Sequence, residues 1–142
     1  MKLAELIQGR NQDIKKIRAG SNIAEAASKL TAEKVGALLV EDEDGGISGI
    51  ISERDIVRGM GLHGADLQDI TVSELMTRDL IRCKSSDTVN EAMAMMTHRH
   101  IRHLPVFDDE QLVGLISIRD LMKHRIMEVQ SEAEALREYM FS

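Results

Sequence analysis

Two copies of one segment follow each other in the sequence, and this repetition constrains the fold more than any other feature. Residues 13–40 align with residues 79–106 at an offset of 66, and residues 46–58 align with residues 111–123 at an offset of 65. The identical pairs are Asp13/Asp79, Glu25/Glu91, Ala26/Ala92, Thr31/Thr97, Leu38/Leu104, Val40/Val106, Gly49/Gly114, Ile51/Ile116, Ser52/Ser117, Arg54/Arg119 and Asp55/Asp120. A tandem repeat predicts two similar units, and we expect neither copy to be stable alone.

Each copy predicts the order strand, helix, strand, strand, helix. The first helix of each copy begins at a capping residue that is followed three positions later by a glutamate, at Asn22 and at Thr88. Apolar residues then recur at helical spacing, and a compact apolar strand follows. The strands are expected at 14–17, 37–40 and 47–52 in the first copy, and at 80–83, 104–107 and 112–117 in the second. The predicted fold class is therefore mixed α/β (α+β).

The expected domain organisation follows the repeat. The first unit covers residues 7–60, a linker covers 61–74, the second unit covers 75–124, and an amphipathic helix extends over 125–142. Residues 59–64 match the spacing G-x-G-x-x-G of dinucleotide-binding loops. That fingerprint needs a strand before it, whereas a capped helix at 53–58 precedes it here. We therefore interpret these glycines as a helix end and a flexible linker.

Composition excludes several classes of protein. Of the 142 residues, 43% are apolar and 30% charged, which is unlike a disordered chain. No apolar run approaches the roughly 18 residues of a membrane span, and no signal peptide is recognisable, so we expect neither membrane insertion nor export. The 18 basic and 24 acidic residues give a net charge of −6, which disfavours a nucleic-acid partner. The single cysteine, Cys83, forms no intrachain disulfide, and a reducing cytoplasm fits.

A Ser-x-Arg-Asp segment at the last predicted helix of each copy carries the strongest chemical signal. Ser52 with Asp55, and Ser117 with Asp120, have the spacing of a helix capping box. Capping does not require the arginine that both copies carry between them. A hydroxyl, a guanidinium and free N–H groups at one helix start form a phosphate site, and a carboxylate beside them can accept both hydroxyls of a ribose. From the sequence alone, the segment can be interpreted either as a helix cap or as a nucleotide-binding site.

No catalytic or metal motif competes with these two interpretations. His98, His100 and His103 lie close in sequence, but their spacing does not make them converge, so we interpret them as a basic helix end and expect no metal site. Cys83 falls in a predicted strand and is interpreted as a buried apolar thiol. No nucleophile and base show a recognisable spacing, and we expect the protein not to be an enzyme.

The tandem arrangement and its closing motif resemble a pair of cystathionine-β-synthase (CBS) domains, the Bateman module, in a stand-alone bacterial-type protein. The motif occurs as Gly49-Ile-Ile-Ser-Glu-Arg-Asp-Ile56 and again as Gly114-Leu-Ile-Ser-Ile-Arg-Asp-Leu121. Arg102-His-Leu-Pro-Val106 is similar to the start of a family strand. The resemblance covers about residues 7–125 and implies pseudo-twofold symmetry with two clefts that bind adenosine-containing ligands.

The resemblance implies which residues form each cleft. One cleft would combine Ser52, Arg54 and Asp55 with Ile81, Arg82, Cys83, Arg102, His103, Leu104 and Pro105. The other would combine Ser117, Arg119 and Asp120 with Ile17, Arg18, Gly36, Ala37 and Leu38. The first copy departs from the family pattern, because Leu39 stands where proline is usual and Gly36-Ala37 stands where the second copy has Arg102-His103. The second of these clefts is therefore expected to offer less charge to a phosphate.

The function implied is a non-catalytic regulatory module. The expected ligand is AMP, ADP or ATP, with NADH possible, and ligand binding would transmit energy or redox state to an unknown regulated protein. Without a fused enzyme or channel, the module would act through that partner or as a ligand buffer. The alternative is a protein-interaction scaffold whose clefts are vestigial, and a nucleotide-dependent shift in melting temperature would separate the two.

The C-terminal segment predicts a homodimer. A heptad-like stripe of apolar residues runs through it at spacings of 4, 3, 4, 3 and 4, namely Met122, Ile126, Val129, Ala133, Leu136 and Met140. The stripe is shorter than three heptads, so it would have to add to other dimer contacts. The alternative is that the stripe packs on its own domain.

Overall fold

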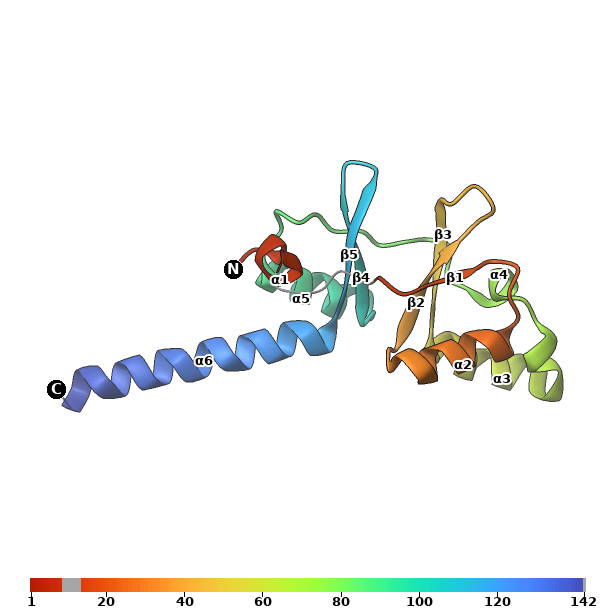
Figure 1. Cartoon of the computed structure of the whole chain (residues 1–142). Coiled ribbons are helices and arrows are strands. Elements are labelled where there is room, and N and C mark those ends of the chain that lie inside the picture. The colour runs from red at the N-terminus through yellow and green to blue at the C-terminus, as the bar shows by residue number, and fades with distance from the viewer. Residues whose placement is uncertain (9–13, 142) are drawn as a thin grey trace. The chain divides into compact units, whose positions relative to one another are not determined.

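Two compact units make up the protein, shown in Figure 1, a computed structural model that describes residues 1–8 and 14–141. Residues 13–80 form one unit, here called the first-copy unit. Residues 1–12 together with 81–142 form the other, the second-copy unit. Asp13, one member of the aligned pairs, lies outside the described residues. Each unit mixes helices and strands, as the repeat predicts.

The first-copy unit has the predicted element order. It contains β1 (Lys16–Arg18), α2 (Ile23–Glu33), β2 (Ala37–Glu41), β3 (Ile47–Ser52) and α3 (Glu53–His63), followed by a 3₁₀ helix, η1 (Gly64–Asp69), and α4 (Val72–Leu75). The sheet order is β1-β2-β3, with β1 parallel and β3 antiparallel to β2. The four residues 37–40 of the central strand are fully buried. Ile23, Ala26 and Leu30 of α2 pack in the same core.

The second-copy unit repeats this order except at its first strand. It contains α1 (Leu3–Gln8), α5 (Val89–Arg99), the antiparallel hairpin of β4 (His103–Asp108) and β5 (Gln111–Ser117), and α6 (Ile118–Phe141). The strand predicted over 80–83 is absent, and a single parallel bridge between Cys83 and Val106 stands in its place. That part of the secondary-structure prediction is wrong.

Two ladder bonds of the first copy are missing here, and Pro105 explains one of them. In the first copy, the amide of Leu39 donates to the carbonyl of Lys15 at 3.1 Å and extends the pairing of β1. The corresponding residues of the second copy are Pro105 and Ile81. Proline has no N–H, so this ladder bond cannot form. At the other end, the Ser85 amide donates to Asp108 Oδ1 at 3.2 Å, whereas its counterpart Ala19 donates to the Glu41 carbonyl at 2.9 Å. The two bonds around Cys83 remain, from its own amide to the Pro105 carbonyl and from the Phe107 amide to the Cys83 carbonyl.

The first helix of each copy begins and ends with an equivalent cap. The Asn22 side chain accepts from the Glu25 amide at 2.8 Å, and the Thr88 hydroxyl accepts from the Glu91 amide at 3.1 Å. At the C-terminal ends, Lys34 and His100 both adopt the left-handed conformation with φ of 56°. His98 in the last turn of α5 and the C-cap His100 therefore lie at a helix end, as predicted, whereas His103 is the first residue of β4 and not part of that end.

A short helix from elsewhere in the chain completes each unit. In the first-copy unit, α4 joins α2 through the bridge between Thr71 and Asn22, and the Val72 amide donates to the Ser21 carbonyl at 2.7 Å. In the second-copy unit, α1 makes the matching contacts: Lys2 bridges Thr88, and the Leu3 amide donates to the Asp87 carbonyl at 2.9 Å. Segment 2–7 is thus the structural counterpart of segment 71–76.

The glycine motif at residues 59–64 lies in a helix. Helix α3 runs to His63, so Gly59 and Gly61 are helical and Gly64 is the C-cap with φ of 57°. Residues 61–74, expected as a linker, contain the end of α3, η1 and the start of α4. A Cβ on Gly59 would lie 2.6 Å from a methyl of Leu75 and 2.8 Å from a methyl of Leu67. This glycine allows η1 and α4 to pack closely on α3.

Helix α6 continues far beyond the hairpin that precedes it (Figure 1). Leu121 is fully buried in the core of the second-copy unit, and Ile118 packs against that core. Every residue from Val129 to Phe141 is exposed. Within residues 1–8 and 14–141, no helix combines the length and the apolar character needed to cross a bilayer.

Candidate functional site

The two Ser-x-Arg-Asp segments form capping boxes where α3 and α6 begin. The Ser52 amide donates to Asp55 Oδ2 at 2.9 Å, and the Asp55 amide donates to Ser52 Oγ at 3.4 Å. The Ser117 amide donates to Asp120 Oδ2 at 2.9 Å, and the Asp120 amide donates to Ser117 Oγ at 3.2 Å. The capping interpretation is confirmed in both copies.

Asp55 has further partners that tie it into the first-copy unit. Its Oδ1 accepts from the Thr77 hydroxyl at 3.2 Å and pairs with Arg58 Nη2 at 3.0 Å, while Oδ2 also accepts from Ser52 Oγ at 3.2 Å. The residue is only 4% exposed. Each carboxylate oxygen therefore already accepts two hydrogen bonds, and ribose hydroxyls would have to displace Thr77 or the half-exposed Arg58 side chain.

Asp120 occupies a more open position than Asp55. It is half-buried, and its Oδ2 accepts from Ser117 Oγ at 2.8 Å. The arginines at the second position of each helix, Arg54 and Arg119, are both exposed. Capping does not use these guanidinium groups, so both helix starts present a cation beside a carboxylate.

Register within each hairpin brings the helix start beside the first residues of the preceding strand. Ser117 lies opposite His103 in the β4–β5 pair, and the Ile118 amide donates to the Arg102 carbonyl at 2.8 Å. Residues that the resemblance assigned to different clefts are therefore neighbours within the second-copy unit. In the first-copy unit, the equivalent neighbour of Ser52 is Ala37. Near its helix start the second-copy unit thus has Arg102 and His103 where the first-copy unit has Gly36 and Ala37.

The remaining residues assigned to the first cleft lie on both sides of β4. Arg82 is exposed and stacks its guanidinium 4.2 Å from the ring centroid of Phe107. Ile81 is half-buried and Leu104 and Pro105 are buried, with Leu104 in the core of the second-copy unit. The Cys83 amide donates to the Pro105 carbonyl at 3.1 Å, so these two residues are direct neighbours.

Cys83 is confirmed as a buried thiol. It is 4% exposed, and its Sγ donates a weak bond to the Pro105 carbonyl at 3.6 Å. Burial, and secondarily the nearby Asp87 carboxylate, raise the pKa of the Cys83 thiol to about 12. The thiol is therefore protonated at neutral pH, and a thiolate nucleophile is not available there. Among the described residues, no three His, Cys, Asp or Glu side chains converge as metal ligands would.

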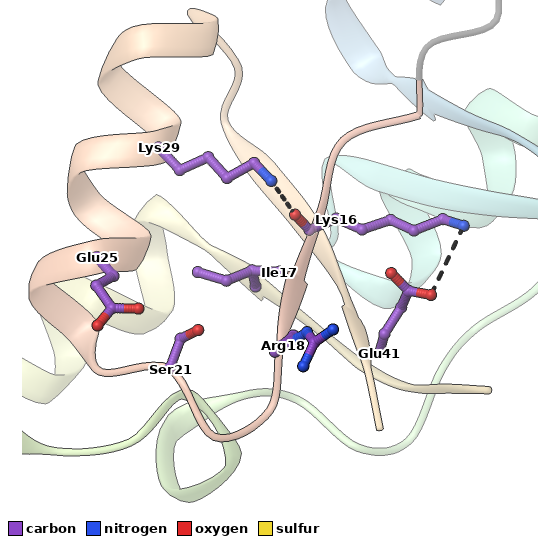
Figure 2. Close-up of a pocket in the computed structure, with 7 residues that line it drawn as sticks. All are labelled: Lys16, Ile17, Arg18, Ser21, Glu25, Lys29 and Glu41. Carbon is purple, nitrogen blue, oxygen red and sulfur yellow. Dashed lines mark hydrogen bonds and ion pairs between the residues drawn. The ribbon is translucent and has the colours of Figure 1, made fainter. Parts of the chain in front are cut away.

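A pocket of about 380 Å³ lies in the first-copy unit between β1 and α2 (Figure 2). Its walls are Lys16, Ile17, Arg18, Ser21, Glu25, Lys29 and Glu41. Two of the residues assigned to the second cleft, Ile17 and Arg18, belong to it, whereas Gly36, Ala37 and Leu38 do not. The Lys29 ammonium donates to the Lys16 carbonyl, and Lys16 lies 4.0 Å from Glu41.

Five of the pocket residues were not predicted as site residues: Lys16, Ser21, Glu25, Lys29 and Glu41. The available signal was the alternation Lys16-Ile17-Arg18, which places two cations on the face of β1 opposite the buried Ile17. The three cationic and two anionic side chains offer charge of both signs to a polar ligand.

The comparison with known protein families identifies the fold. The sequence model of the CBS domain matches residues 7–61 and 72–126. The chain belongs to the CBS-domain family. It carries two CBS domains in tandem, and the C-terminal helix α6 extends beyond the second match. CBS-domain proteins are generally non-catalytic regulatory modules, and those similar to this chain include proteins of unknown function.

Stand-alone CBS-domain proteins are similar to this one over most of their length. The crystal structure of the CBS-domain protein ATU1752 from Agrobacterium tumefaciens has a TM-score of 0.85 and 36% identity, and covers 87% of this chain and 92% of that one. The protein YhcV of Bacillus subtilis is 32% identical over 120 residues, 84% of either chain. The mitochondrial CBSX3 of Arabidopsis thaliana is 33% identical over 83% of this chain, which spans 59% of that relative.

Proposed function

We propose that this CBS-domain protein is a non-catalytic sensor that binds an adenine nucleotide and signals its level to a protein partner. The expected ligands are AMP, ADP and ATP, and NADH is a further candidate because its diphosphate would use the same cations. One observation supports this most directly: in the second-copy unit Ser117 lies opposite His103 where α6 begins, and the exposed Arg119 and the half-buried Asp120 follow in the first turn of that helix. The same proposal places the protein in a reducing compartment such as the cytoplasm.

The helix start of the second-copy unit is the favoured binding site. The amides at the start of α6 and the positive end of its dipole attract a phosphate, and Arg119 and Arg102 add charge. Asp120 Oδ2 is engaged by its own serine, but the carboxylate is half-exposed and can accept a ribose hydroxyl. Asp55 is less suitable, because its four bonds hold the first-copy unit together.

Calorimetric titration with AMP, ATP and NADH tests the proposal. We expect Asp120→Asn to weaken AMP binding by about 10- to 150-fold, because a charged acceptor is worth roughly 1.5–3 kcal/mol. Asp109→Asn is the matched control: it removes the same charge at the far end of the same hairpin, and asparagine tolerates its positive φ of 55°. Adenosine should bind more weakly than AMP.

The scaffold alternative makes the opposite prediction. If neither the adenine nucleotides nor NADH binds or raises the melting temperature at millimolar concentration, the sensor proposal fails and vestigial clefts are favoured. If Asp120→Asn and Asp109→Asn change AMP affinity equally, the proposal that the protein binds nucleotides stands, but the assignment of the site to Asp120 is refuted.

A further inference from the structure

Helix α6 presents an apolar face that its own unit does not cover. The stripe predicted from the sequence is exposed in the structure: Met122 by 49%, Ile126 by 54%, Val129 by 47%, Leu136 by 61% and Met140 by 69%. The alternative, that this stripe packs on its own domain, is therefore wrong. A large exposed apolar stripe on a helix is typical of a surface that is buried in an assembly.

The spacing of this stripe fits the seam of a two-stranded coiled coil. The a positions are Ile126, Ala133 and Met140, and the d positions are Met122, Val129 and Leu136. A second copy of the same helix supplies the matching seam, because each copy offers the same six residues in the same order. The partner argued here is therefore another copy of this chain.

The charges beside the seam distinguish the two orientations. In a parallel, in-register pair, Glu132 at position g faces Arg137 at position e of the second copy, and symmetry forms this attractive pair twice. In the antiparallel pair with full overlap, Glu132 faces Glu132, and Lys123 faces Arg137. Like charges then oppose each other along both edges. Charge complementarity thus favours the parallel arrangement.

We infer that α6 of this protein pairs with α6 of a second copy as a parallel, in-register coiled coil. The seam is shorter than three heptads, and isolated coiled coils of this length are marginal. We therefore expect this pairing to add to other contacts between the two copies rather than to hold the dimer alone. This inference is independent of nucleotide binding.

Sedimentation equilibrium of the full chain over a range of concentrations tests the pairing. Val129→Glu places a charge at the centre of the seam, and Ser131→Glu adds the same charge on the outer face as the control. We expect Val129→Glu to weaken the dimer by at least about tenfold, since each dimer would bury two such charges, and Ser131→Glu to leave it unchanged. Circular dichroism checks that both variants fold.

Disulfide trapping tests the orientation. Met140→Cys should form a covalent dimer on oxidation, because position 140 faces itself in the parallel pair. In the antiparallel pair, position 140 would face Met122 of the second copy, and the two cysteines would lie about 27 Å apart along the helix. Ser131→Cys, on the outer face, is the control.

Charge reversal gives a second readout of orientation. Glu132→Arg and Arg137→Glu should each weaken the parallel dimer, and the double variant should restore it. A monomeric wild-type chain at every concentration, equal effects of Val129→Glu and Ser131→Glu, or a dimer strengthened by Arg137→Glu alone would each overturn the inference.

Discussion

Two glycines of helix α3 provide a matched test of why the motif at residues 59–64 exists. Gly59 and Gly61 both lie inside the helix, and neither has a positive φ. They differ only in their surroundings. A Cβ at position 59 would approach methyl groups of the buried Leu75 and Leu67 to 2.6 and 2.8 Å, whereas a Cβ at position 61 would have nothing within 4 Å. The changes are Gly59→Ala and Gly61→Ala.

The expected magnitudes follow from these distances. Alanine inside a helix is more stable than glycine by about 0.5–1 kcal/mol, and both variants gain this term. Gly59→Ala also overpacks the contact between α3 and the two leucines, at a cost of about 1–3 kcal/mol. Gly61→Ala should therefore stabilise the protein, Gly59→Ala should be less stable than Gly61→Ala by about 1–3 kcal/mol, and only Gly59→Ala should disturb η1 and α4.

Urea unfolding followed by circular dichroism measures the difference. With a slope of about 1–3 kcal/mol per molar urea, the two midpoints should differ by on the order of 1 M. Nucleotide affinity should not separate the variants, because neither glycine lies at a helix start. Equal midpoints would refute the close-packing role of Gly59, and a specific loss of NADH binding in Gly59→Ala would revive the dinucleotide interpretation.

Three other predictions concern stability. Asp55→Ala should lower the free energy of unfolding more than Asp120→Ala in urea titrations, because Asp55 is only 4% exposed and its bonds to Thr77 and Arg58 tie α3 to the first-copy unit, whereas Asp120 is half-buried. Lys34→Gly and His100→Gly should each raise the melting temperature, since both positions are left-handed and glycine removes a strain of about 1 kcal/mol. The pKa of the Cys83 thiol is raised from 9.0 to about 12 in the folded protein, so its contribution to the free energy of unfolding is fully present below pH 9. Stability should fall as the pH rises from 9 toward 12, and Cys83→Ala should remove that part of the slope; an unchanged slope would contradict the buried-thiol account.

Short-range patterns made much of the fold predictable. The repeat, the element order and the capping boxes at Ser52 and Ser117 depend on residues within a few positions of each other. The missing strand at 80–83 was also within reach, because Pro105 removes the N–H that its counterpart Leu39 donates. The apolar run at 80–83 favours a strand, whereas the missing N–H of Pro105 opposes one.

Long-range packing set the remainder. Helix α3 continues through Gly59 because Leu67 and Leu75 pack on it, and local propensity contains no trace of that contact. The bonds from Thr77 and Arg58 to Asp55 likewise join residues whose proximity only the folded chain creates. The residue types of the candidate site were therefore predictable, whereas the bonds from Thr77 and Arg58 to Asp55 were not.

Each unit is completed by a short helix that lies next to the other copy in the sequence, and this limits how the chain can be divided. Helix α1 precedes the first copy in the sequence but packs at the start of α5 in the second, and α4 precedes the second copy but packs at the start of α2 in the first. A single copy with only the helix that precedes it would therefore lack the helix that packs at its own α2 or α5. Cutting this protein at the repeat boundary therefore gives incomplete halves, whereas removing segment 2–7 damages the copy that lies farther along the chain.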